Sequence, residues 1–171
     1  MRPLRSAAGS VVVWVATIAA PCHAETTRSF VVDATIVNGC AVTQSGGSWG
    51  KIDFGTVSGL RTGTLDADLL SGGASGLRIE CTPGTSVTMT ADNGNNPVSG
   101  QRRLMQAGVT TAVPYALFAN GSATPWTTQG IALSFPAGTT RQTVPVKGRA
   151  TLPGSLRAGR YVDTVRITLT W

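Results

Sequence analysis

The chain has 171 residues, a formal net charge of +6 and only 13% charged residues, about half the usual fraction. Its basic residues are scattered, with only Arg102 and Arg103 adjacent, so no basic stripe is available to bind a nucleic-acid backbone. This composition argues against a nucleic-acid partner and is typical of a secreted β-protein or an assembly subunit.

The first 24 residues have the pattern of a secretory signal peptide. Arg2 and Arg5 form a positive start, residues 11–20 are an apolar run, and Ala24 is a small residue before a cleavage site. A membrane anchor is the alternative, but spanning a bilayer takes about 20 apolar residues, more than this run provides. We expect residues 1–24 to be removed, which leaves a mature chain without an integral membrane segment, exported through the periplasm.

Removal of the signal peptide changes the chemistry that the chain can offer. The only histidine, His23, and one cysteine, Cys22, leave with it. Cys40 and Cys81 remain, and an even pair in an exported protein usually forms a disulfide, which stabilises by about 3 to 4 kcal/mol in the chain-entropy model. A reactive thiol is the alternative.

No catalytic, metal or cofactor site is expected in the mature chain. Without histidine, the usual Ser-His-Asp and Cys-His arrangements cannot be built. Lys51 and Lys147 are the only bases for a Ser-Lys dyad, and both lie in runs typical of strands with a solvated face. Asp66 and Asp68 come closest to a pair of carboxylates, and we interpret them as part of a solvated turn.

Short runs typical of strands recur along the mature chain between Gly, Pro and Asn turn signals. They occupy residues 29–37, 50–57, 77–81, 86–91, 113–118, 131–135, 143–150 and a closing run from Tyr161. No stretch keeps a helical apolar period for three turns, the nearest being residues 65–70. This pattern predicts one all-β domain, an antiparallel sandwich.

The first of these runs, residues 29–37, is amphipathic in the manner of a strand. One face carries Phe30, Val32, Ala34 and Ile36, and the other carries Val31, Asp33, Thr35 and Val37. Such a segment can insert four apolar side chains into a groove. The alternative is an ordinary first strand of its own domain.

The closing run alternates in the same way. Tyr161, Val165, Ile167, Leu169 and Trp171 lie on one face, and Thr164, Arg166, Thr168 and Thr170 lie on the other. The sequence ends within this run, so we expect an open hydrophobic edge of the kind that invites pairing with another chain.

Several motifs, taken in their order, resemble the spore coat protein U domain, which occurs in subunits of archaic, Csu-type chaperone-usher pili. They are the alternating run into Cys40, "FG" at Phe54, "IECTPGT" around Cys81, "RRLM" at residues 102–105, "YALF" at residues 115–118 and the closing "AGRYVDTVRITLTW". Together they cover essentially all of residues 29–171.

The resemblance implies an immunoglobulin-like β-sandwich that lacks its last strand, so that the C-terminal strand borders an open groove. A periplasmic chaperone fills the groove first, and at the outer-membrane usher the N-terminal segment of the next pilus subunit replaces it. Residues 25–37 would then be a donor-strand arm that inserts Phe30, Val32, Ala34 and Ile36, and residues 38–171 the sandwich domain. The groove edge would consist of Tyr161, Val165, Ile167, Leu169 and Trp171.

The function implied is that of a structural subunit, shaft or adaptor, of a surface pilus that supports adhesion and biofilm formation. Three alternatives remain. A self-complete secreted domain would bind carbohydrate or a surface through aromatic side chains such as Trp49 and Trp126. A spore or envelope coat protein would share the domain without assembly by an usher, and a secreted enzyme would need a site that the sequence does not indicate.

Overall fold

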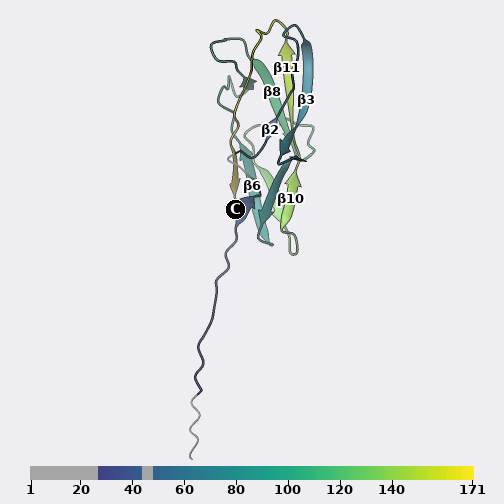
Figure 1. The fold of residues 1–171 in the computed structure, drawn as a ribbon. Coiled ribbons are helices and arrows are strands. Elements are labelled where there is room, and N and C mark those ends of the chain that lie inside the picture. Colours follow the sequence, from purple (N-terminus) through teal and green to yellow (C-terminus); the bar gives the residue numbers. More distant parts are fainter. Residues whose placement is uncertain (1–26, 44–47) are drawn as a thin grey trace, which may run out of the picture. The chain divides into compact units, whose positions relative to one another are not determined.

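The computed structural model describes residues 27–43 and 48–171, so the expected signal peptide, residues 1–24, lies outside the described residues. The backbone divides into two units, Met1–Thr35 and Ile36–Trp171. All strands of the described residues belong to the second unit (Figure 1). Within the two described ranges, no helix is long and apolar enough to span a membrane.

The described part of the second unit forms twelve strands. They are β1 (Cys40–Val42), β2 (Lys51–Ile52), β3 (Thr62–Ser71), β4 (Ala74–Ser75), β5 (Leu77–Cys81), β6 (Thr85–Ala91), β7 (Arg102–Leu104), β8 (Val113–Ala119), β9 (Ile131–Phe135), β10 (Arg141–Val144), β11 (Val146–Pro153) and β12 (Ile167–Thr170). Every pairing between them is antiparallel.

One layer is a sheet in the order β2-β3-β11-β8-β7, with β4 also paired to β3. Figure 1 shows β3, β11 and β8 side by side. β11 lies at the centre, where Ala150 is opposite both Leu65 and Tyr115. Its residues alternate strictly between buried and exposed, so one face of this sheet is turned toward the core.

The facing layer is built on one long, interrupted two-stranded ribbon. β5 pairs with β10, and β6 pairs with β9. Hydrogen bonds from the N–H of Cys81 to the O of Thr140 and from the N–H of Gly84 to the O of Phe135 bridge the interruption. β1 pairs with β5 and β12 pairs with β6, so β1 and β12 lie end to end along the same edge of the ribbon.

The two layers enclose a single apolar core. Its largest fully buried side chains are Phe135, Leu77, Ile79, Met89, Val87 and Val144. Ile52 and Phe54 pack over β11 at Gly148, where a Cβ atom would lie 2.9 Å from Cζ of Phe54. Burial of alternate residues from both sheets is what the period-two apolar pattern requires, and the all-β sandwich expected from the sequence is confirmed.

Several local predictions were wrong. Asp66 and Asp68 do not lie in a solvated turn, since both belong to β3, on its exposed face. The run at 50–57 forms only β2. Residues 29–37 form no strand in the single chain, which goes against the alternative of an ordinary first strand and leaves the donor arm a prediction. The closing run becomes a regular strand only at β12.

Candidate functional site

The C-terminal segment is paired along one side from Val162 to Thr170. Val162 exchanges two main-chain hydrogen bonds of 2.9 Å with Met105, next to β7. Asp92 then donates its N–H to the O of Arg166 at 2.9 Å, and β12 continues along β6 with Leu169 opposite Met89. The segment therefore begins beside one sheet and ends as an edge strand of the other.

The second side of β12 has no strand partner among the described residues. Since the main-chain groups of Arg166 face Asp92, the alternation of an antiparallel strand turns those of Val165, Ile167 and Leu169 toward the open edge. We call this side, residues 165–169, the open edge. It presents a ready template for another extended chain.

The structure brings together most of the side chains predicted for the groove edge. Tyr161, Val165, Ile167 and Leu169 are half-buried and pack against the core. Trp171 lies beyond β12, and 56% of its surface is exposed. The open edge thus borders apolar side chains that the sandwich covers only in part.

Two aspartates fasten the C-terminal segment to the turn after β6. The carboxylate of Asp163 accepts hydrogen bonds from the N–H of Asn95 at 2.8 Å, Nδ2 of Asn96 at 3.2 Å and the hydroxyl of Tyr115 at 2.7 Å. In the opposite direction, Oδ1 of Asp92 accepts the N–H of Arg166 at 2.9 Å. We call this reciprocal arrangement of Asp92 and Asp163 the carboxylate clasp.

Gly94 is required inside the clasp. Its φ is +78°, a conformation that favours glycine, and a Cβ atom would lie 2.1 Å from Oδ2 of Asp163. Its N–H donates to Oδ1 of Asp92 at 2.9 Å. The turn therefore closes tightly around both carboxylates.

A buried arginine supports the same region. Arg102 is only 4% exposed, and its guanidinium donates to the main-chain O atoms of Asp92, Trp126 and Thr127 at 2.5 to 3.1 Å. Burial lowers the pKa of Arg102. Burial, together with the hydrogen bond to Asp163, raises the pKa of Tyr115 well above its usual value.

The clasp was not predicted from the sequence. Asp163 lies two residues after Tyr161 and two before Val165, so the period-two pattern places its carboxylate on the apolar face of the closing run. A charged residue on such a face needs hydrogen-bond partners. The position of Asp163 among apolar residues was therefore the sequence signal that could have indicated the clasp.

The segment at residues 30–37, before the sandwich, exposes its apolar side chains on both faces. Phe30, Val32 and Ile36 are 85%, 83% and 87% exposed, and Ala34 is exposed as well. On the second face, Val31 and Val37 are 88% and 76% exposed. Such a row of uncovered apolar side chains is unusual in a finished soluble domain.

Cys40 and Cys81 form a disulfide, as expected from their number. The bond links β1 to β5, where the two cysteines are directly opposite each other. It therefore anchors the chain at the point where the N-terminal segment enters the sandwich.

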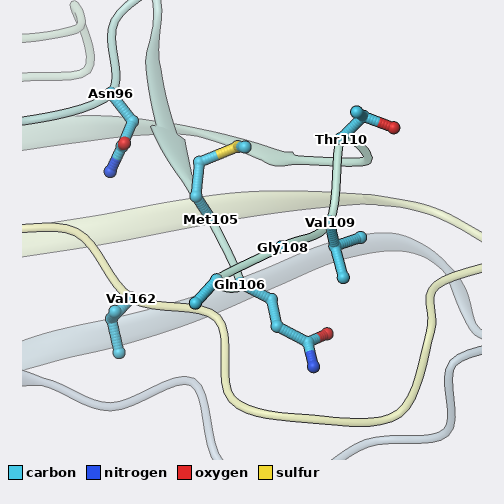
Figure 2. Close-up of a pocket in the computed structure, with 8 residues that line it drawn as sticks. Asn96, Met105, Gln106, Gly108, Val109, Thr110 and Val162 are labelled. Atoms are coloured by element: carbon cyan, nitrogen blue, oxygen red, sulfur yellow. The ribbon is translucent and has the colours of Figure 1, made fainter.

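A hollow of about 660 Å³ lies where the C-terminal segment meets the chain after β7. Figure 2 shows Val162 beside Met105 and Gln106, with Val109 on the following loop. None of the residues that line it is titratable, so it provides no acid or base for catalysis. In the described ranges, no cluster of three or more His, Cys, Asp or Glu could hold a metal ion.

The other charged and aromatic candidates have structural surroundings. Asp66 forms a two-point ion pair with Arg149 at 2.7 and 2.8 Å, which lowers the pKa of that aspartate. Lys51 pairs with Asp53 on the surface. Trp126 is buried, with its Nε1 donating to the O of Gln129, and Trp49 is half-buried, so neither is an exposed platform for a sugar ring.

The fold is thus a disulfide-linked antiparallel β-sandwich with one open-edged terminal strand. The Spore Coat Protein U domain model matches residues 26–168, and the chain belongs to this family. None of the curated proteins matches the chain significantly.

One solved structure gives a comparison of fold. It is the crystal structure of the CsuC-CsuE chaperone-tip adhesion subunit pre-assembly complex from archaic chaperone-usher Csu pili of Acinetobacter baumannii, with a TM-score of 0.54 and 19% identity. The match covers 80% of this chain and 41% of that one, so the chain spans about two-fifths of its neighbour's length. The likeness supports the immunoglobulin-like sandwich expected from the sequence.

Proposed function

We propose that the protein is a structural subunit of a surface pilus, assembled by a periplasmic chaperone and an outer-membrane usher through donor-strand exchange. One observation carries this proposal: the same chain has an open, half-covered apolar edge at residues 165–169 and an exposed alternating segment that suits it. Membership of the family and the fold shared with a chaperone-usher protein complex support it. Residues 25–37 are the donor arm, and residues 38–171 the receiving domain.

The energetics of strand addition favour this arrangement. Burial of Phe30, Val32 and Ile36 at about 1.5 to 3 kcal/mol each gives roughly 5 to 9 kcal/mol before ordering costs. Main-chain hydrogen bonds to the open edge add to this, and alternate side chains select the register. A single chain leaves both surfaces exposed, so partners gain by joining them.

The exposed arm that precedes the sandwich favours a shaft or adaptor subunit over a tip. The protein then acts at the cell surface, where the fibre supports adhesion and biofilm formation, and its role is mechanical rather than catalytic. A self-complete binding domain is less well supported, because Trp49 and Trp126 are not exposed and residues 29–37 form no strand of their own domain.

The test is to supply the missing strand within one molecule. The oxidised mature chain, residues 25–171, is compared with the same chain carrying a second copy of residues 27–37 after Trp171 through a flexible linker. We expect the extended chain to be monomeric and to unfold more than about 10 °C higher, because about 5 kcal/mol corresponds to at least that shift in a domain of this size.

The control carries the appended segment with Val32→Asp, which places a charge in the groove. It should lose most of the gain. A mature chain that is already monomeric and equally stable without the appended segment would show that the sandwich is complete, and the proposal would be wrong.

A further inference from the structure

This inference rests on the proposed function and specifies its partner. We propose that the open edge receives the arm of a second copy of this chain, antiparallel to β12, in the single register that places Asp33 opposite Arg166 and Arg28 opposite Trp171. The protein is then built to polymerise with itself.

The arm has only one face that suits the groove. From Phe30 to Ile36 the face with Phe30 is entirely apolar, with Arg28 only at its outer end, whereas the opposite face contains Asp33, whose burial beside the core would carry a large desolvation cost. Asp33 must therefore point outward, on the same side of the sheet as Arg166.

Main-chain geometry agrees with this choice. Val165, Ile167 and Leu169 direct both their side chains to the core and their free main-chain groups to the open edge. An arriving strand forms its hydrogen-bonded pairs with these three residues. The outward pairs between them are then non-hydrogen-bonded, with Cα atoms about 4.5 Å apart and side chains close together.

Charge selects one register from those that remain. Arg166 is the only basic residue from Tyr161 to Trp171, and its side chain is 73% exposed. Its present contact, with Oδ2 of Asp92, is 3.5 Å long. Asp33 on the free side would give Arg166 a second carboxylate across the sheet, and opposite charges in such pairs are stabilising.

The same register also places a second pair of complementary side chains, Arg28 and Trp171, opposite each other. Arg28 precedes Asp33 by five residues, and Trp171 follows Arg166 by five, so an antiparallel arm aligns both pairs at once. Trp171 is 56% exposed, and an arginine over an exposed indole gains a cation–π attraction. The inward pairs become Phe30 with Leu169, Val32 with Ile167 and Ala34 with Val165.

A parallel arm is the competing geometry. With Asp33 again beside Arg166, it would bring Arg28 to Tyr161, which is half-buried and donates its hydroxyl to the O of Arg157. It would also place Phe30 next to Asp163, whose carboxylate is already held in the clasp. The antiparallel arm avoids both conflicts.

The test uses cysteine pairs in full mature chains. Thr35 and Thr164, both exposed, would be opposite each other in the proposed register, at a Cα separation that permits a disulfide. Oxidised Thr35→Cys chains are mixed with Thr164→Cys chains, and with Thr168→Cys chains as the matched control about 13 Å further along the strand. Mixed dimers are measured on non-reducing gels.

We expect the Thr35→Cys and Thr164→Cys mixture to give several-fold more mixed dimer than the control. Preferential linkage to Thr168→Cys would indicate the parallel arm and overturn the proposed register. Equal linkage to both variants would also overturn the register, and either result would leave strand exchange itself intact. Chains that do not associate at all would overturn the proposed function as well.

Charge exchange gives an independent readout. Asp33→Lys or Arg166→Glu alone should slow polymer growth, and chains carrying both should recover much of the loss. If each change has the same effect whether or not the other is present, the two residues do not meet and the register is wrong.

Discussion

The carboxylate clasp makes a quantitative prediction for Asp163→Asn. The aspartate accepts three hydrogen bonds, from Asn95, Asn96 and Tyr115, whereas an asparagine offers one oxygen and turns a donor toward the remaining donors. Hydrogen bonds to a charged group are worth about 1.5 to 3 kcal/mol each. The variant loses up to two of these hydrogen bonds, and water replaces part of them on the exposed side. We therefore expect a destabilisation of about 2 to 3 kcal/mol.

Urea unfolding of the oxidised mature chain measures this loss, with Thr164→Ala as the control, an exposed neighbour outside the clasp. The control should change the free energy of unfolding by less than about 0.5 kcal/mol. A double-mutant cycle with Tyr115→Phe should give a coupling energy of about 1 kcal/mol or more. If Asp163→Asn is no more harmful than Thr164→Ala, the clasp does not hold the C-terminal segment.

Three further changes probe the regions around the clasp and the core. Arg102→Lys keeps the charge but cannot reach three carbonyl oxygens, so a loss of about 3 kcal/mol or more is expected in the same urea assay; an unchanged midpoint would contradict this. Gly148→Ala should cost about 1 to 3 kcal/mol by thermal unfolding, because its Cβ would lie 2.9 Å from the ring of Phe54, and a neutral result would mean that the ring moves freely. Because the pKa of Tyr115 is raised in the folded state, its contribution to stability is present below about pH 10 and is lost as the pH rises above it, when the unfolded chain releases the proton first. Tyr115→Phe should reduce this alkaline fall in unfolding midpoint, and Tyr161→Phe should keep it, since Tyr115 remains.

Strands with clear edges in the sequence were predictable. The runs at β5 and β9 occur where alternating apolar residues are bounded by Gly or Pro, and the structure has the same limits. β3 was missed because residues 65–70 place two aspartates among leucines. In the sheet those aspartates alternate outward, and Arg149 from β11 pairs with one of them, a contact across 83 positions that no local pattern contains.

The candidate site was predictable in part for the same reason. The apolar face of the closing run follows from its period, and four of its five predicted members are half-buried in the structure. Trp171 differs because no strand of the described residues lies beside it to cover the indole. The sequence indicated Arg102 only as part of the motif at residues 102–105. Its burial could not be predicted, because it depends on carbonyl groups from two other loops.

The end-to-end placement of β1 and β12 on one edge of the ribbon has a mechanical consequence. In a fibre joined by such arms, tension enters a subunit at Cys40, crosses the disulfide to Cys81 and follows the ribbon to Met89 opposite β12. The load therefore travels along the strands and meets their hydrogen bonds in shear, with a covalent link at its first step. The other sheet stays largely outside this path, whereas the ribbon that bears the load carries the six largest fully buried side chains of the core.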